Sequence, residues 1–226
     1  MERYNLFHLI HNSLRASLYH TALQLQQADF TDKAVIDDAS ERIGEIMMLF
    51  EGHARKEENF VFPAIAIYEP AVAACFETEH QEDERFTREL RTRLTQLETA
   101  STLLERLSAG KELNDAFVTF TVCQLKHMAH EEKVINPILW RYYTDEEIKA
   151  INAAIASSIE PWIQDFYSTW MIRGINDRDA LELVKAVERT AAEPAFLVLL
   201  QKLEQEWTPG RFKKFEQALS EGALIE

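Results

Sequence analysis

HARKEENFVFPAI, residues 53–65, and HMAHEEKVINPIL, residues 127–139, align without a gap although they start 74 residues apart. Both read H-x-x-x-E-E-x-x-φ-x-P-x-φ, where φ is aliphatic. Side chains four residues apart share one face of a helix, with roughly 6 Å between them. His53 with Glu57, and His127 with Glu131, therefore each present an imidazole and a carboxylate to one point. This spacing is typical of metal ligands.

One further histidine precedes each segment. His11 lies 42 residues before His53, and His80 lies 47 residues before His127. These histidines and the two carboxylates stand where the helical period calls for Leu or Ile. Burying a polar group without a partner costs about 1–3 kcal/mol, so these side chains must contact one another or something bound between them. We expect six metal ligands: His11, His53, Glu57, His80, His127 and Glu131.

The repeat also predicts how the ligands are shared. Two helical hairpins that each supply two imidazoles and one carboxylate would face each other with approximate twofold symmetry. This arrangement suits two ions, each held by two imidazoles, with both carboxylates as bridges. Nitrogen and oxygen donors without thiolate favour Fe or Mn over Cu(I) or structural Zn.

The apolar residues around these ligands predict the fold. They recur at steps of three or four, the period of an amphipathic helix, in four stretches: 7–25, 36–57 ending before Pro63, 76–104 ending near Gly110, and 113–138. The connections are short, so consecutive helices should be antiparallel neighbours. We therefore expect residues 1–143 to form an up-down-up-down four-helix bundle in an all-α protein.

Residues 144–226 keep a helical composition but in shorter segments. Thr144 to Glu147 and Ser157 to Glu160 have capping-box spacing. Asn176 and Thr208 are expected helix starts. We predict four or five helices forming a C-terminal extension packed on the bundle, anchored by three tryptophans: Trp162, Trp170 and Trp207. The segment contains no histidine, so it should contribute no metal ligand.

Composition narrows the function classes. Glycine and proline together account for only 12 of 226 residues, which favours helix throughout. The formal charge of −14 makes nucleic acid and anionic membranes poor partners. No apolar run approaches the roughly 20 residues of a membrane span, and no signal-peptide pattern is present. The two cysteines, Cys75 and Cys123, lack C-x-x-C spacing and are expected to be small buried residues in a cytoplasmic protein.

At the doubled motif the chain resembles the hemerythrin-like (HHE cation-binding) family of non-haem di-iron four-helix bundles, over about residues 5–140. The resemblance implies an oxo- or hydroxo-bridged pair of Fe ions, with Mn or Zn as substitutes, that meets O2, NO or peroxide. By motif position, one iron would be bound by His11 and His53 and the other by His80 and His127. Glu57 and Glu131 would bridge them.

One position departs from the oxygen-carrying hemerythrins. They have a fifth histidine one turn after the third-helix ligand, whereas this chain has Glu84. The four-His, two-Glu set is more similar to the proteins that repair damaged iron-sulfur centres. Those usually carry a short N-terminal cysteine-containing domain, while this chain begins directly with the first ligand helix.

Two other kinds of metal site fit the polar residues poorly. A ferritin-like site needs two Glu-x-x-His pairs, and only Glu77 to His80 has that spacing. A zinc peptidase needs His where the chain has Val134. Glu84 is either an additional ligand or an ion-pair partner of Arg15, and His8 either an additional ligand or a residue beside the site.

Several polar neighbours of the motif are expected to lie outside the metal's coordination. Glu58 and Glu132 should either orient the ligands or face solvent, and His20 and His130 should face solvent.

We therefore expect a cytoplasmic di-iron protein that binds or reacts with O2, NO or peroxide. The sequence does not decide between binding and catalysis. The alternative is a non-catalytic iron, oxygen or redox sensor, or a metal store, acting through its C-terminal helices. A homodimer is kept as an open alternative. An exposed apolar strip on residues 144–226 would favour the sensor, and an open channel to the metals would favour reaction with an external ligand.

Overall fold

The computed structural model describes residues 3–190 and 193–221, and over these residues the regular secondary structure is entirely helical. The expected all-α bundle with additional C-terminal helices is confirmed. The chain divides into two compact units. The first holds the stretch up to His8 and residues 17–159, and the second holds Leu9–Ala16 and the residues from Glu160 onward.

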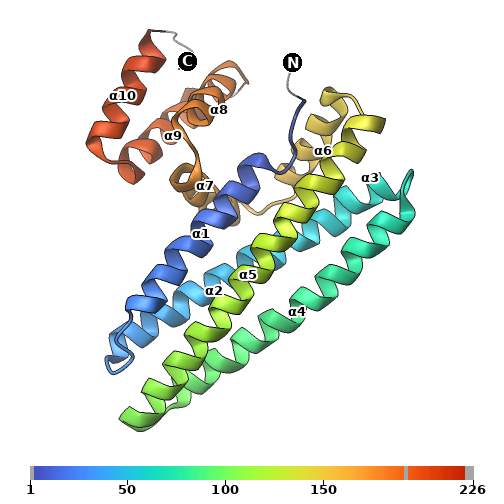
Figure 1. Ribbon diagram of the computed structural model, residues 1–226. Helices are drawn as coiled ribbons and strands as arrows, with labels where there is room; N and C mark the ends of the chain where they lie inside the picture. Colours follow the sequence, from blue (N-terminus) through green and yellow to red (C-terminus); the bar gives the residue numbers. More distant parts are fainter. Residues whose placement is uncertain (1–2, 191–192, 222–226) are drawn as a thin grey trace. The chain divides into compact units, whose positions relative to one another are not determined.

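The first unit is built on long helices (Figure 1). They are α2 (Lys33–Lys56), α4 (Pro70–Thr99), α5 (Leu103–Tyr142) and the later part of α1 (His8–Gln27), joined by η1 (Glu57–Val61) and α3 (Phe62–Ala66) and followed by α6 (Asp145–Ser157). Helix α4 packs along α5 and against α2. None of the helices in the described residues has both the length and the apolar character needed to cross a bilayer.

Apolar side chains fill the first unit on both sides of the polar positions in the stripes. Towards the α4–α5 turn, the fully buried residues include Leu49, Leu90, Phe117 and Phe120. Towards the opposite end, a second cluster forms around Val61, Phe62, Ile65, Phe76, Ile135 and Leu139. At roughly 25 cal/mol per Å² of apolar area, burial of this kind is the main term that holds the helices together. The polar residues of the repeat lie between these two layers.

The boundary between α4 and α5 differs from the prediction. We expected the third helix to run to Gly110, but α4 ends at Thr99 and Gly110 lies inside α5, which starts at Leu103. The reason is a capping box: the Thr102 side chain accepts from the Glu105 N–H, and the Glu105 carboxylate accepts from the Thr102 N–H. Two satisfied backbone donors decide the start of the helix, whereas a small residue inside a helix is tolerated.

The second unit has its own core, which joins α7 (Pro161–Gly174), α8 (Asp177–Thr190), α9 (Glu193–Glu206) and α10 (Pro209–Ser220). Trp207 is buried against Phe215, with 5.5 Å between ring centroids, and donates its Nε1–H to the Ile172 carbonyl. Trp170 is also buried, but Trp162 is 56% exposed, so its expected role as an anchor is wrong. It occupies the second position of α7, where its ring points to solvent.

The expected helix starts after residue 143 are confirmed with one exception. Thr144 forms a capping box with Glu147, and Asn176 and Thr208 each accept from the backbone N–H three residues on. The Ser157 box does not form: Ser157 ends α6 and donates to the Ala153 carbonyl, and α7 begins at Pro161. Proline is itself favoured in the first turn of a helix. The packing of residues 144–226 on the bundle stays a prediction.

Candidate metal centre

The two halves of the repeat enter the site by different backbone routes. We expected a helix to stop before Pro63, but the chain stays helical there: α2 passes into the π-helix η1, which starts at Glu57, and α3 follows. Proline has no N–H and crowds the carbonyl four residues earlier. The widened turn accommodates it, because the Phe62 N–H donates to the Glu57 carbonyl. In the second half, α5 runs unbroken through Glu131 and Pro137. Single π-turns are common at functional sites.

Four buried side chains of the first unit converge on one point. One ligand atom from each of Glu57, His80, His127 and Glu131 lies within 4.8 Å of the others. The Nε2 atoms of His80 and His127 are 3.1 Å apart, and His127 Nε2 lies 3.2 Å from Glu131 Oε1. Ligands bound at about 2.1 Å from one ion cannot be more than about 4.2 Å apart, so these two close contacts fit a shared ion.

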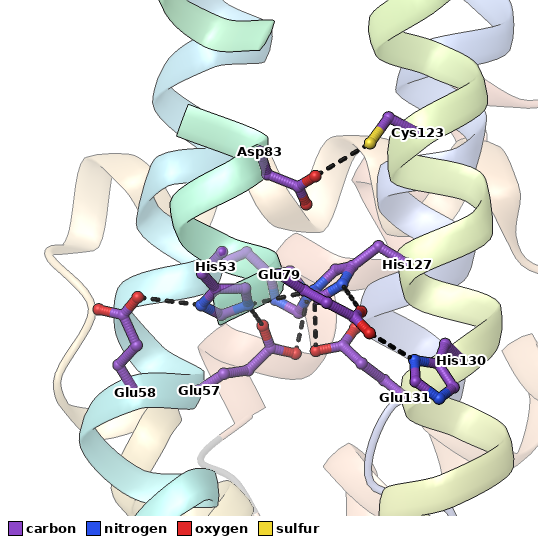
Figure 2. A network of polar contacts seen from close by, with 10 residues as sticks. His53, Glu57, Glu58, Glu79, Asp83, Cys123, His127, His130 and Glu131 are labelled. Carbon is purple, nitrogen blue, oxygen red and sulfur yellow. Dashed lines mark hydrogen bonds and ion pairs between the residues drawn. The ribbon is translucent and has the colours of Figure 1, made fainter. Parts of the chain in front are cut away.

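Glu57 faces two histidines with different oxygens. Its Oε1 lies 3.1 Å from His53 Nε2, and its Oε2 lies 3.5 Å from His80 Nε2. The carboxylate is 2% exposed, and both imidazoles are also buried. A carboxylate between two imidazoles, with one oxygen for each, has the disposition of a bridging ligand. Figure 2 shows the Glu57 and Glu131 carboxylates turned toward each other from their two helices.

His11 is a buried residue of the first helix. It lies in α1, is fully buried, and belongs to the stretch Leu9–Ala16 that groups with the second unit. Its predicted role as a ligand stays a proposal. The helix that carries it continues without a break into residues 17–27 of the first unit.

Two carboxylates outside the cluster bind the far nitrogens of its histidines. Glu58 Oε1 lies 2.9 Å from His80 Nδ1, and Glu79 Oε2 lies 3.0 Å from His127 Nδ1. A carboxylate is only an acceptor, so each Nδ1 carries its hydrogen and each Nε2 is directed at the cluster. The contact with His80 supports the expectation that Glu58 orients a ligand. Glu79 was not predicted, because the residue next to a core histidine carries no periodic signal.

The carboxylates also set the protonation of the imidazoles. Burial alone lowers the pKa of His127, but the hydrogen bond and charge of Glu131 and the charge of Glu57 outweigh it and raise that pKa to about 10. Burial likewise lowers the pKa of His80, and Glu57 and Glu58 raise it to a net value above the ordinary one. A metal ion would bind the imidazoles in competition with protons.

A pocket of about 390 Å³ leads to the cluster between α2, α4 and α5. Its lining includes His53, Glu57, His80 and His127. Phe50, Thr87 and Gln124 also line the pocket, as do Arg91 and Glu51, which pair with each other at 2.7 Å. The volume lies in the range of small-molecule sites.

The remaining candidates lie outside the cluster. Glu84 is 72% exposed at its side chain and pairs with Arg88 at 3.8 Å; its expected pairing with Arg15 stays a prediction. His8 is not a member of the cluster. His20 is exposed as expected, but His130 is only partly exposed and binds Glu79.

The two cysteines differ from each other. Cys75 is exposed, so its expected burial is wrong, while Cys123 is half-buried and its Sγ lies 3.0 Å from Asp83 Oδ1. Cys75 lies on the side of α4 that faces solvent.

A helical bundle with imidazoles and carboxylates gathered in its interior defines a metal-binding helical protein. Comparison with protein families assigns residues 3–139 to the hemerythrin HHE cation binding domain. This match covers more than half of the chain, which therefore belongs to the hemerythrin HHE family. Comparisons with curated proteins and with solved structures give no match.

Proposed function

We propose that this protein holds two iron ions and binds or reacts with O2, NO or peroxide. His11 and His53 would hold one ion, and His80 and His127 the other. Glu57 and Glu131 would bridge the two. Manganese or zinc are substitutes with the same donor preferences. When bound, the ions supply reversible one-electron chemistry and open coordination positions for a small ligand.

The pocket is the observation that carries this proposal over a purely structural metal site. A structural ion is enclosed by its ligands, whereas a reactive one keeps a route to solvent. Here His53, Glu57, His80 and His127 line the pocket itself. A small molecule that entered this pocket would meet these donors directly.

The protein's own groups have two tasks in this function. Glu58 and Glu79 hold the imidazoles with Nε2 inward, so the donors need little rearrangement when an ion binds. Glu57 and Glu131 supply the negative charge that offsets the ions in a buried site. We place this chemistry in a reducing cytoplasm, which suits two unpaired cysteines.

The test is metal analysis of protein purified without oxygen, followed by absorption spectra after separate additions of O2, NO and peroxide. We expect iron to be retained and at least one of the three reagents to change the spectrum. Retention of iron with no spectral response to any of them would refute the reactive function and leave a store or sensor.

The alternative, a sensor or metal store, has one observation in its favour. Trp162, Leu197 and Val198 of the second unit are more than half exposed, and exposed apolar groups favour partner contacts. Sedimentation of metal-loaded and metal-free protein would test it. A change of oligomeric state with metal, abolished by Leu197→Glu, would support the sensor; an invariant monomer would count against it.

A further inference from the structure

Glu79 occupies a position on α4 that joins two histidines of α5. Its Oε2 lies 3.0 Å from His127 Nδ1 and its Oε1 lies 2.9 Å from His130 Nδ1. Both carboxylate oxygens are used, so the side chain cannot rotate without losing one contact. Figure 2 shows Glu79 between His127 and His130.

Phe76 supports this arrangement from the apolar side. Its fully buried ring lies 4.8 Å from the His130 ring and 6.1 Å from the His127 ring, measured between centroids. The Glu79 side chain is 29% exposed and that of His130 is 42% exposed, whereas that of His127 is 6% exposed. The contacts thus run from a partly exposed imidazole through a carboxylate to a buried imidazole of the cluster.

We propose that Glu79 is a positioning residue for the metal centre: it fixes the ring of His127 and strengthens His127 as a donor, while His130 holds Glu79 in place. This inference rests on the proposed metal site. Because the carboxylate accepts the Nδ1 hydrogen, the Nε2 lone pair of His127 stays available to an ion. A carboxylate on the far nitrogen also makes an imidazole more basic, and removal of such a partner typically weakens metal binding about 10- to 100-fold.

A surface ion pair is the competing explanation for the same contacts. Such pairs contribute little, and their loss changes no property of the centre. Glu58 provides an internal comparison, since it contacts His80 through one oxygen and its side chain is 46% exposed. We expect Glu79, with two contacts and less exposure, to matter more than Glu58.

The experiment uses full-length protein and Zn²⁺, which is diamagnetic, as the probe. Zn²⁺ affinity is measured by chelator competition, and the Nδ1–H resonance of His127 is followed by NMR. The variants are Glu79→Gln, Glu58→Gln and His130→Ala. Glu82→Gln is the matched control, because Glu82 is an exposed carboxylate on the same helix.

We expect Glu79→Gln to weaken Zn²⁺ binding about 10- to 100-fold and to shift the His127 Nδ1–H resonance and speed its exchange with water. Glu58→Gln and His130→Ala should have smaller effects, and Glu82→Gln none. If Glu79→Gln matches Glu82→Gln in both affinity and resonance, the positioning role is refuted while the metal site stands. If the unmodified protein binds no Zn²⁺, Mn²⁺ or Fe²⁺, the proposed function fails and the inference fails with it.

Discussion

The Nε2 atoms of His80 and His127 face each other at 3.1 Å across the interface of α4 and α5. With the Nδ1 hydrogens held by carboxylates, two neutral imidazoles would present two lone pairs to one spot, and these repel each other unless a proton or an ion lies between them. Their carboxylate partners on the outer side, Glu58 and Glu79, hold them in this orientation. A proton fills this place in the metal-free protein, in line with the raised pKa of His127, and a bound ion that accepts both lone pairs would replace it.

Loss of one imidazole should remove metal and stability together. We expect His53→Ala and His127→Ala each to lower the metal content and the Tm, because an ion that binds only the folded state stabilises it by about 2.7 kcal/mol when its concentration is 100 times Kd. Thermal unfolding with and without metal measures this. His20→Ala, at an exposed position of α1, is the control. Full metal occupancy and an unchanged Tm in both variants would rule these residues out as ligands.

Metal binding should depend on pH in a definite direction. In the metal-free protein the pKa of His127 is raised from 6.5 to about 10, so its paired, protonated form stabilises the fold below pH 6.5 and this contribution is lost as pH rises through about 10. Metal affinity should rise with pH over the same interval, because the ion displaces the proton. Addition of Zn²⁺ at pH 7.5 in weak buffer should release protons, and fewer in His127→Ala. Equal release by both proteins would contradict this.

Glu84 should be dispensable for holding metal. It takes the position of the fifth histidine of oxygen carriers, but it is exposed and pairs with Arg88. We expect Glu84→Gln to keep the metal content of the unmodified protein, and neither protein to give an oxygenated spectrum that survives repeated cycles of vacuum and air. If Glu84→Gln held less metal, Glu84 would be a ligand. A durable, reversible oxygenated spectrum would show that the protein is an oxygen carrier.

The two cysteines should react at very different rates. Burial, reinforced by the Asp83 carboxylate, raises the pKa of the Cys123 thiol to about 12, while Cys75 is exposed. The thiolate is the reactive form, and at pH 8 a pKa near 12 leaves about one thiol in ten thousand ionised. Mass spectrometry after brief alkylation should find Cys75 modified first. Asp83→Asn should speed modification of Cys123 severalfold; an unchanged rate would remove Asp83 from the explanation.

A pair of glycine substitutions should have opposite effects on stability. A methyl group at Gly110 would collide with the ring of Phe30, so Gly110→Ala should lower the free energy of unfolding by about 1–3 kcal/mol. Gly44, inside α2, has open space at the same position, and Gly44→Ala should raise it by up to about 1 kcal/mol. Urea unfolding of both variants provides the comparison. A stable Gly110→Ala protein would mean that Phe30 moves aside freely.

The sequence predicted the parts of the fold that depend on periodicity. The spacing of His53, Glu57, His127 and Glu131 places their donors inward on any amphipathic helix, and the structure buries all four. Local backbone detail was harder. The helix boundary is set by the Thr102–Glu105 capping box and not by Gly110, and the π-turn at Glu57 depends on how the chain accommodates Pro63, which no periodic pattern records.

The period of the apolar residues does not predict which side chains surround the metal ligands. Glu79 is adjacent in sequence to a core histidine and so should lie off the core face, yet its long side chain reaches across to α5. Cys75 and Trp162 were assigned to the interior by residue type alone, and both are exposed because their positions face away from the packed side of their helices. Whether such a residue is buried depends on which helices pack against its position.

The most direct test is the number of iron ions retained per chain. Protein loaded with Fe²⁺ without oxygen, freed of excess by desalting, and assayed for iron and protein should hold close to two irons per chain. His127→Ala, treated in the same way, should hold clearly fewer. A value near zero, or a value of one that His53→Ala leaves unchanged, would contradict the two-ion centre.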